Sequence, residues 1–587
     1  MVFGPPAWAP KLPFDPPDSV SIPDFLFDEQ YGRHPLGYAK NPFTCGLSGA
    51  TYNALEVKER IDFLARGMAK EFGWSPNNGT EWDKVVNIFS VNTIDYNVLN
   101  WAIHRLNGIA TPANAVYSQK ELEHQLRDSG AKYIFTCLPL LDIAKGAAQT
   151  VGIPKTNIYM LELSKEATGG QESPKGYKTV NDLIRIGSKE ARLEPLKWEK
   201  GQGARQVAFL CYSSGTSGLP KGVMISHRNV IANTLQVTTF EKHYRDTKRD
   251  KSLNNQSEYT ENGLGLLPMS HIYGLIVICH VGTYRGDGVI VLPRFEMKPY
   301  LNAIQTYKIA TLYLVPPIII LMTKQKDVVS QFDMSSVDNI FTGAAPLGSE
   351  TAQELQNQFP SWCIRQGYGL TETCTVVCTT SGHDVWFGSS GSLIPGVQAK
   401  IVTVEGVECT GYEERGELVV KSPSVTLGYL HNEKSTKETY IDGWMRTGDE
   451  AMVCKAPSGN EHIIITDRIK ELIKVKGHQV APAELEAHLL THPAVADCCV
   501  IQVPDAHSGE IPKAFVVKSP SVGLEENDRH IKRDIQRHVE KHKAKYKWIT
   551  GGVEFIDVIP KSPSGKILRR FLRDKDKERR TKEGAKL

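Results

Sequence analysis

A glycine-rich loop that contains one lysine holds residue types suited to binding phosphate. The segment SSGTSGLPKG, residues 213–222, contains three glycines, four hydroxyl side chains and a lysine. Glycines let the backbone approach a ligand closely, hydroxyl and backbone N–H groups donate hydrogen bonds, and lysine adds positive charge. The loop departs from the P-loop pattern because Gly222, rather than Ser or Thr, follows Lys221. We expect it to bind phosphate oxygens, although an ordinary Ser/Gly surface loop would have a similar composition.

Two further glycine-containing segments have residue types that suit a nucleotide. In QGYGLTE, residues 366–372, a tyrosine ring between two glycines could stack on a flat base. Glu372 at its end could bind Mg²⁺, which prefers oxygen ligands. In TGAAPLG, residues 342–348, the small side chains would let a planar adenine lie against the backbone. In isolation, QGYGLTE is better explained by a tight turn with a structural tyrosine, and TGAAPLG is explained equally well by a packing turn.

Three charged residues near the end of the chain stand beside turn-forming residues. Asp449 ends the segment GWMRTGD, where its carboxylate could accept hydrogen bonds from both ribose hydroxyls, and Arg468 could add a donor. Lys566 follows a Ser-Pro-Ser-Gly turn and therefore sits at the tip of a loop. Taken singly, these residues are more simply interpreted as surface charges.

The elements that must position these residues alternate between helices and short apolar strands. A buried strand is expected at 207–211, directly before the first loop, and others at 85–91 and 131–136. An amphipathic pattern predicts a helix at 54–71. This alternation predicts an α/β architecture with largely parallel sheets. The polar stretch 244–260 is typical of a surface insertion.

The pattern restarts near residues 467–470, which predicts a separate small C-terminal domain. Within it, helices are expected at 482–490 and 528–542, and strands at 495–503 and 514–518. About 115 residues is a normal size for such a domain.

Composition narrows the class of protein. A chain of 587 residues is too long for one compact core, so two or more domains are expected. The net charge of +3 argues against a dedicated nucleic-acid-binding protein. The eleven cysteines are scattered and no secretory signal is recognisable, which favours reduced thiols in an intracellular compartment. The longest apolar stretches are too short to cross a bilayer, so no transmembrane segment is expected.

Taken in order over about 350 residues, these segments resemble the adenylate-forming superfamily. That superfamily includes acyl-CoA synthetases, peptide-synthetase adenylation domains and luciferases. The segments PMSHIYG and QGYGLTE, and Gln479 followed by Val-Ala-Pro, are most similar to 4-coumarate–CoA ligase-like fungal acyl-CoA ligases. The resemblance implies an α/β fold with a large N-terminal body of two α/β subdomains plus a small β-barrel-like subdomain, and a mobile α+β C-terminal domain.

The expected domain boundaries follow from the chain pattern and the resemblance. They are a proline-rich N-terminal extension at 1–50, a large adenylation (AMP-binding) domain at 51–469, a small mobile C-terminal domain at 470–580 and a tail at 581–587.

The resemblance also implies roles for individual residues in the first half-reaction. Thr216 and Glu372 would hold Mg²⁺ together with the ATP phosphates, and Lys566 would bridge the attacking carboxylate and the α-phosphate. The full set expected to bind ATP or AMP is Ser213, Ser214, Gly215, Thr216, Ser217, Gly218, Lys221, Ala344, Ala345, Tyr368, Gly369, Thr371, Asp449 and Arg468.

Other residues match positions used later in the reaction. Lys470 matches the hinge about which the C-terminal domain would rotate. Lys474 and Gln479 match residues that act near the site in the second half-reaction. The residues expected to line the acyl pocket are His271, Tyr273, Cys374 and Val376.

The implied reaction is the ATP-dependent ligation of a carboxylic acid to coenzyme A through an acyl-adenylate, with Mg²⁺ as cofactor. Two alternatives stay open: an adenylating enzyme that transfers the acyl group to a carrier-protein thiol, and a catalytically silent nucleotide- or acyl-binding protein. Met445 and Arg446, and the Thr-Cys-Thr-Val-Val run after Glu372, depart from the coumarate-ligase pattern. Aromatic, medium-chain and secondary-metabolite acids therefore all remain candidate substrates.

The chain ends in Ala-Lys-Leu, which resembles the Ser-Lys-Leu peroxisomal address. The residues from Lys566 onward carry ten Lys/Arg and four Asp/Glu, a local charge of +6 that suits an exposed tail. We therefore expect a peroxisomal import receptor as a partner and a peroxisomal location, with the cytoplasm as the alternative.

Overall fold

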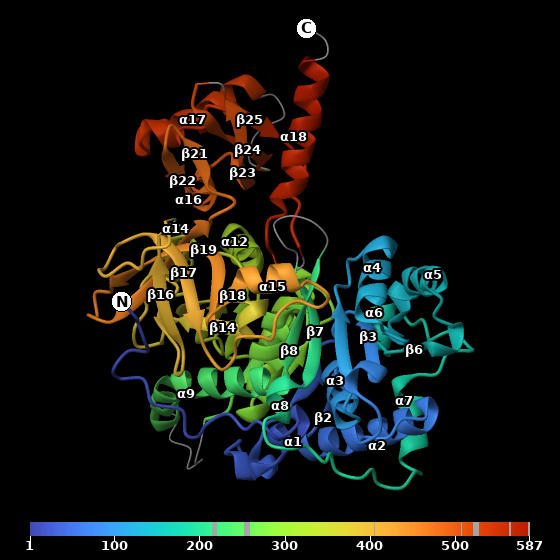
Figure 1. Ribbon diagram of the computed structural model, residues 1–587. Coiled ribbons are helices and arrows are strands. Elements are labelled where there is room, and N and C mark those ends of the chain that lie inside the picture. Colours follow the sequence, from blue (N-terminus) through green and yellow to red (C-terminus); the bar gives the residue numbers. More distant parts are fainter. Residues whose placement is uncertain are drawn as a thin grey trace.

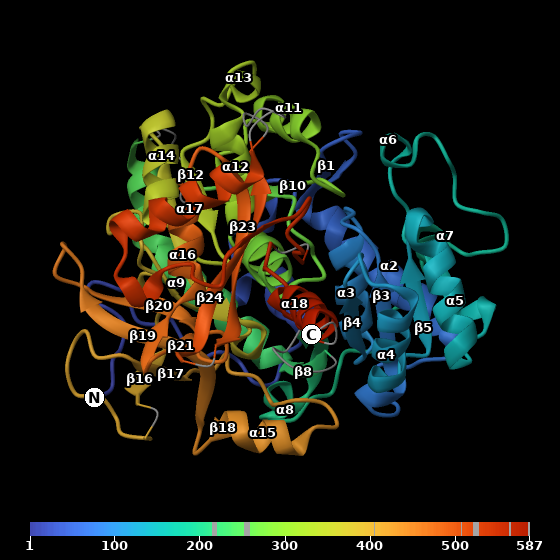
Figure 2. The same cartoon turned by 90° about the horizontal axis from the view of Figure 1, so that it is seen from above.

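Two mainly parallel sheets form the centre of a large N-terminal body, and a smaller C-terminal domain stands above it (Figure 1). The computed structural model describes residues 1–213, 220–251, 259–403, 405–505, 507–519, 527–562 and 565–584. Figure 2 looks down through the C-terminal domain onto the body.

The first sheet has the strand order β6-β5-β3-β4-β7-β8 and carries the phosphate-loop segment at one edge. Its strands are parallel except for β7 and β8, which pair antiparallel so that Ser213 lies opposite Lys221. The strand bounds are β3 (Val85–Phe89), β4 (Ile109–Ala113), β5 (Tyr133–Thr136), β6 (Ile158–Met160), β7 (Val207–Ser213) and β8 (Lys221–Ser226).

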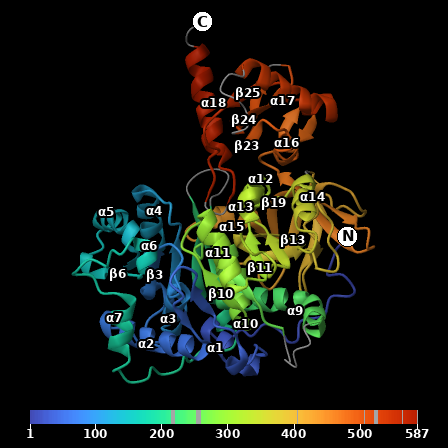
Figure 3. The same ribbon diagram turned by 180° about the vertical axis from the view of Figure 1, so that it is seen from behind.

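The second sheet has nine strands in the order β15-β14-β13-β12-β11-β9-β10-β1-β2. The run from β13 to β1 is parallel, and the pairs at both ends are antiparallel. Figure 3 shows this half from behind, with α9 and α11 beside the strands. The bounds are β1 (Phe43–Cys45), β2 (Thr51–Tyr52), β9 (Asn262–Gly265), β10 (Gly288–Val291), β11 (Thr311–Leu314), β12 (Asn339–Thr342), β13 (Cys363–Leu370), β14 (Thr375–Thr379) and β15 (Ser392–Leu393).

Helices cover both sheets, and their ends follow ordinary capping chemistry. The helix Ala54–Phe72 begins after Asn53, whose side chain accepts from backbone N–H groups, and it ends at Gly73 in the left-handed conformation. The α-helices of the body are α1 (Ile22–Phe27), α2 (Ala54–Phe72), α3 (Tyr96–Arg105), α4 (Gln119–Ser129), α5 (Leu141–Val151), α6 (Lys165–Thr168), α7 (Val180–Gly187), α8 (Gln202–Arg205), α9 (His227–Lys251), α10 (Gly282–Tyr284), α11 (Met297–Tyr307), α12 (Pro316–Lys324), α13 (Lys326–Val329), α14 (Ser349–Gln358) and α15 (Glu433–Thr439).

A five-stranded antiparallel sheet occupies the place expected for the small β subdomain. Its strands are β16 (Gln398–Val402), β17 (Gly416–Lys421), β18 (Tyr440–Ile441), β19 (Trp444–Lys455) and β20 (Glu461–Arg468). Because β20 pairs with β19 and ends at Arg468, this sheet leads directly to the C-terminal domain.

The C-terminal domain is an α+β unit with its own core. A sheet of order β22-β21-β24-β23, with β25 beside β24, packs against α16 and α17. The predicted face of α17 is confirmed, since Ile531, Ile535 and Val539 are buried. The bounds are β21 (Ile473–Val475), β22 (His478–Val480), α16 (Pro482–Leu489), β23 (Val495–Asp505), β24 (Gly509–Lys518), α17 (Asp528–His542), β25 (Val553–Phe555) and α18 (Arg569–Gly584).

The α/β architecture and the separate α+β domain are confirmed, but two local predictions need correction. The prediction of a surface insertion at 244–260 is wrong for residues 244–251. These residues continue helix α9 as far as Lys251, and Arg245 is only 9% exposed. Residues 1–50 are more than an extension, because β1 adds a strand to the large sheet and Phe3 bridges to Ala399. Within the described part of the chain, no helix is long and apolar enough to cross a membrane.

Candidate active site

A cavity of about 570 Å³ lies where the C-terminal domain meets the large body. Its walls come from the segments TGAAPLG and QGYG, the end of β20, α16 and the loop before α18. Segments far apart in the sequence therefore meet at one place. The predicted site residues that line this cavity are Ala344, Ala345, Tyr368, Gly369, Asp449, Arg468 and Lys566.

Asp449 is held in the cavity wall by two neighbours. β19 and β20 place Asp449 directly opposite Arg468, and Arg468 Nε lies 3.2 Å from Asp449 Oδ1. Tyr368 OH donates to Asp449 Oδ2 at 2.6 Å. Burial raises the pKa of Asp449, while Arg468 and Tyr368 act in the opposite direction. The carboxylate is thus fixed in place by a cation and a hydroxyl before any ribose binds.

Lys566 reaches the same cavity from a turn of the C-terminal domain. Gly565 has a φ of +79°, and a Cβ added there would lie 3.1 Å from Val315 Cβ and 3.3 Å from Pro317 Cδ. Any larger residue at 565 would therefore be strained in backbone and would crowd the body. The glycine allows the turn to press against the start of α12 and to direct Lys566 inward.

The charges around Lys566 show which groups it faces. Burial and the nearby Arg468 lower its pKa to about 8, whereas Asp449 and Glu372 oppose the shift. In turn, burial and the charge of Lys566 lower the pKa of His271 to about 4. Lys566 therefore lies within electrostatic range of Asp449, Glu372 and His271.

Glu372 joins the two segments that were expected to meet at the phosphates. Ser213 Oγ donates to Glu372 Oε1 at 3.2 Å, and Tyr429 OH donates to the same oxygen at 2.9 Å. Among the residues that the structure describes, no hydrogen bond reaches Glu372 Oε2. A half-buried carboxylate with one oxygen available and hydroxyls beside it fits the all-oxygen ligation that Mg²⁺ prefers.

The structure describes only the two ends of the phosphate loop. Lys221 Nζ donates to Ser435 Oγ at 2.8 Å and lies 5.0 Å from the ring centre of Tyr429. The loop therefore begins and ends beside Glu372 and its partner Tyr429. The remaining predicted loop residues lie outside the described ranges: Ser214, Gly215, Thr216, Ser217 and Gly218.

Backbone geometry explains the glycines and small residues of the segments QGYG and TGAAPLG. A Cβ on Gly369 would lie 1.5 Å from Thr375 O, so only glycine fits between β13 and β14. Ala344 has a φ of +67°, an uncommon left-handed conformation for a residue with a side chain. Thr371 lies in the short turn Thr371–Thr373 next to Glu372 and is not part of the cavity wall.

The four predicted acyl-pocket residues lie on two segments, His271 and Tyr273 on one and Cys374 and Val376 on the one that pairs with the end of β13. Tyr273 OH donates to Phe341 O at 2.7 Å, and Val376 N donates to Asn233 Oδ1 at 3.2 Å. Cys374 and Val376 are 0% and 3% exposed. His271 is half-buried, and burial and then the charge of Lys566 lower its pKa. None of these four residues is among the described residues that line the cavity, so the acyl pocket remains a prediction.

The structure does not bring Lys470, Lys474 or Gln479 to the cavity. Lys470 is exposed in the turn that joins β20 to β21. Lys474 and Gln479 pair across β21 and β22, and both side chains are exposed. This arrangement is the one expected when the C-terminal domain presents Lys566, rather than the β21–β22 hairpin, to the site.

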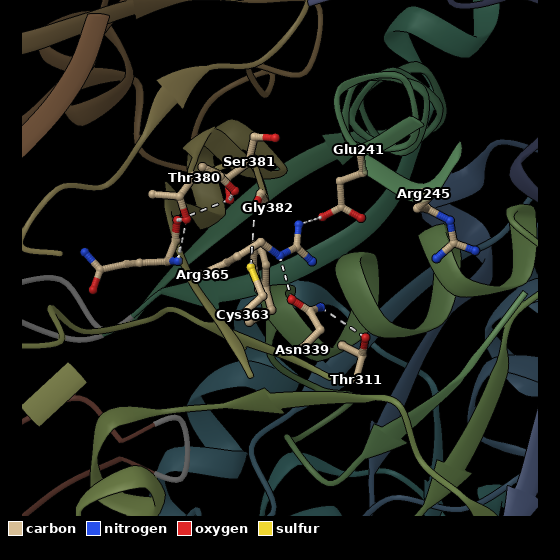
Figure 4. Close-up of polar contacts among 12 residues, drawn as sticks. Glu241, Arg245, Thr311, Asn339, Cys363, Arg365, Thr380, Ser381 and Gly382 are labelled. Atoms are coloured by element: carbon tan, nitrogen blue, oxygen red, sulfur yellow. Dashed lines mark hydrogen bonds and ion pairs between the residues drawn. The ribbon is translucent and has the colours of Figure 1, made fainter. Parts of the chain in front are cut away.

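A buried network of ion pairs around Arg365, which directly precedes QGYG on β13, was not predicted. Arg365 donates to Glu241 Oε1 at 2.9 Å and to Asn339 Oδ1 at 2.8 Å (Figure 4). Glu241 also pairs with Arg285. Burial alone would raise the pKa of Glu241, but the charges of Arg365 and Arg285 outweigh it and lower this pKa to about 2. Glu241 is on α9, and the polar residues of that helix were the available signal.

Comparison with known proteins agrees with this geometry. The family model described as "AMP-binding enzyme" matches residues 35–430, and "AMP-binding enzyme C-terminal domain" matches residues 484–566. The acyl-CoA ligase cm3C of Cordyceps militaris is 41% identical, covering 98% of this chain and 90% of that protein. The acyl-CoA ligase easD of Emericella nidulans is 39% identical, covering 98% and 100%.

Solved structures share the fold. The anthranilate CoA ligase AuaEII in complex with anthranoyl-AMP matches with a TM-score of 0.76 at 23% identity, covering 95% of this chain and 97% of that one. ATP-bound MatB from Rhodopseudomonas palustris matches with a TM-score of 0.75 at 23% identity, covering 95% and 99%. The predicted resemblance is confirmed: the chain belongs to the AMP-binding, adenylate-forming enzyme family, with acyl-CoA ligases as relatives along nearly its whole length.

Proposed function

We propose that this protein is an AMP-forming acid–CoA ligase whose first half-reaction takes place in the cavity between its two domains. The observation that carries the proposal is the meeting of Lys566, from the C-terminal domain, with the Asp449, Arg468 and Tyr368 group of the body. A cation placed opposite a nucleotide-binding carboxylate is suited to bringing a carboxylic acid and ATP together.

In the first half-reaction a carboxylate oxygen of the acid attacks the α-phosphorus of ATP. The P–O bond to the β-phosphate breaks, pyrophosphate leaves and an acyl-adenylate remains. Asp449 would accept the ribose hydroxyls, and Tyr368, Ala344 and Ala345 would frame the adenine. Lys566 would offset the negative charge that builds up as the two anionic groups approach.

Mg²⁺ is the cofactor that best fits the oxygen groups around Glu372. When bound, the ion would neutralise charge on the ATP phosphates. Glu372, with Thr216 from the loop, would hold it. Ser213 and Tyr429 already orient the Glu372 carboxylate through hydrogen bonds to Oε1.

In the second half-reaction the thiolate sulfur of coenzyme A would attack the acyl carbonyl. The bond from that carbonyl to the AMP oxygen breaks, and AMP leaves. Lys566 has no role in this step, whereas Lys474 and Gln479 are exposed on a hairpin outside the cavity. A rotation of the C-terminal domain about Lys470 would withdraw Lys566 from the cavity and bring the hairpin with Lys474 and Gln479 to it. A carrier-protein thiol remains the alternative acceptor.

The substrate is a carboxylic acid, and aromatic, medium-chain and secondary-metabolite acids are the candidates. A panel of aromatic, medium-chain and secondary-metabolite acids tests the proposal through pyrophosphate release with and without coenzyme A. Thioester formation with at least one acid supports it. Pyrophosphate exchange without thioester would favour the carrier-protein alternative, and no exchange with any acid would favour the silent binding protein.

We also propose that the protein is imported into peroxisomes through its final Ala-Lys-Leu. These residues lie outside the described ranges, but α18 ends at Gly584 directly before them. An N-terminally tagged protein that lacks residues 585–587 should lose co-localisation with a peroxisomal marker. The full-length control should keep it, and the same diffuse pattern for both would contradict import.

A further inference from the structure

Three histidines with no assigned role in adenylation gather on the C-terminal domain, at the edge of the cavity. His488 lies near the end of α16, whereas His538 and His542 lie one helical turn apart on α17. The rings of His488 and His538 are stacked with centres 4.3 Å apart. The ring of His542 lies 5.2 Å from His488 and 5.3 Å from His538. One ring nitrogen from each of the three lies within 4.8 Å of the others.

Hydrogen bonds set the ring tautomers of two of these histidines. His488 Nε2 lies 3.3 Å, and His542 Nδ1 2.9 Å, from the backbone oxygen of His538. A carbonyl oxygen can only accept, so both nitrogens must carry the proton. Each ring then keeps a lone pair on its other nitrogen. Such second partners are typical of histidines that bind metal.

The third histidine has a compatible arrangement. His538 Nε2 lies 2.9 Å from Thr491 Oγ1, which can accept its proton and leave Nδ1 with a lone pair. The nearby His492 is not part of the set, because its Nε2 pairs with Asp534 and its Nδ1 accepts from Ala494 N. In the described part of the chain, no hydrogen bond reaches His488 Nδ1 or His542 Nε2.

We propose that His488, His538 and His542 form a binding site for a first-row divalent transition metal of the Zn²⁺ type. Imidazole nitrogens are preferred ligands of this class, and a three-histidine set leaves one position for water. Nitrogens bound to zinc at about 2.0 Å lie about 3.3 Å apart. The His488 and His538 rings are stacked almost parallel, with 8° between their planes, so metal binding requires them to rotate out of the stack until their lone pairs converge. His542 is exposed and can turn toward the same point.

The site joins two helices at the boundary with the large body. His488 also lines the cavity, and Ala487 beside it lies against Gly348, since a Cβ added at Gly348 would be 3.1 Å from Ala487 Cβ. Figure 1 shows α16 between α17 and α14 of the body. A metal that links α16 to α17 would therefore stiffen the part of the C-terminal domain that contacts the body. The proposed metal site has no part in the ligase reaction, so metal binding can be measured without ATP or acid.

The test is a ZnCl₂ titration of untagged, EDTA-treated full-length protein against a chromophoric chelator. Wild type should bind one equivalent that the variant His542→Ala binds at least tenfold more weakly. His530→Ala is the matched control, because His530 is exposed on the same helix but outside the set. Circular dichroism without metal establishes that each variant is folded.

A second readout separates the histidines from cysteine thiols, which also bind zinc. With one equivalent of Cu²⁺, electron paramagnetic resonance should show nitrogen hyperfine structure in wild type and in His530→Ala. His538→Ala should lose it, and His542→Ala should weaken it. Zinc titrations that coincide for wild type and His542→Ala, or copper spectra without nitrogen coupling in wild type, would overturn the proposal.

Discussion

Replacement of Lys566 should separate the two half-reactions. Lys566→Ala removes the cation that faces Asp449 and the reacting phosphate from the C-terminal domain. Loss of one preorganised charge-stabilising group costs about 10²–10³-fold in rate. Acyl-adenylate formation should fall by that factor, while thioester formation from supplied acyl-adenylate should stay within a few-fold of wild type.

The pKa of Lys566 adds a second, independent signature. Since burial and Arg468 lower it to about 8, the free enzyme carries the charge on about nine-tenths of molecules at pH 7 and about one-tenth at pH 9. For adenylation, kcat/KM should therefore fall about tenfold per pH unit above pH 8, because this ratio reports groups of the free enzyme. Lys566→Arg keeps its charge over this pH range, so its kcat/KM should be lower than that of wild type but should not fall above pH 8.

The assays are ATP–pyrophosphate exchange for the first step and single-turnover thioester formation for the second. Arg570→Ala, a charge removal four residues away, is the control and should change neither step by more than a few-fold. Equal loss of both half-reactions in Lys566→Ala would refute the role given to Lys566. A wild-type pH profile that stays flat to pH 10 would refute the electrostatic reasoning.

Three further changes have defined outcomes. Lys470→Pro fixes φ in the exposed turn and should slow thioester formation while leaving pyrophosphate exchange intact; unchanged transfer in a single turnover would show that residue 470 is not the hinge. Asp449→Asn should raise the KM for ATP in the exchange assay by about 10- to 100-fold, because a hydrogen bond to a charged group contributes about 1.5–3 kcal/mol, whereas the exposed control Asp442→Asn should match wild type. Glu241→Gln should lower the thermal midpoint at pH 7 by leaving Arg285 and Arg365 without their carboxylate. Because folding lowers the pKa of Glu241 to about 2, the ionised carboxylate stabilises the fold above pH 4.5, and this stabilisation is lost as the pH falls toward 2. The difference in thermal midpoint between the variant and wild type should therefore narrow over that range. A difference that does not change with pH would contradict this reasoning.

Much of the fold could be predicted from local pattern. The helix predicted at 54–71 is α2, Ala54–Phe72, because its capping residues and apolar face agree. The helix predicted at 528–542 is α17, Asp528–His542, for the same reason. In both cases the signal lies within one element, where periodicity and capping are sufficient.

The polar part of α9 shows where local pattern was insufficient. Its residues from Tyr244 onward are charged and look solvent-exposed in sequence. Arg245 is nevertheless buried, because Asp287 and Glu261 reach it from other elements at 2.7 and 3.2 Å. The partners are 42 and 16 residues away, and no reading of one segment contains that information.

The nucleotide site was predictable as a set of residues but not as a geometry. Motif order singled out Asp449, Arg468, Tyr368 and Lys566, and all four line one cavity. Their mutual contacts depend on the pairing of β19 with β20 and on the position of the C-terminal domain. The acyl pocket and the histidine site depend on packing between distant elements, and sequence pattern gave no shape for the first and no signal for the second.

The transfer of oxygen from the acid to AMP tests the central claim most directly. The enzyme is given an acid labelled with ¹⁸O in both carboxylate oxygens, together with ATP and coenzyme A, and the products are weighed by mass spectrometry. If a carboxylate oxygen attacks the α-phosphorus, the AMP released on thioester formation carries one ¹⁸O and the pyrophosphate carries none. Unlabelled AMP, or label in ADP or inorganic phosphate, would contradict an acyl-adenylate and with it the roles assigned to the cavity.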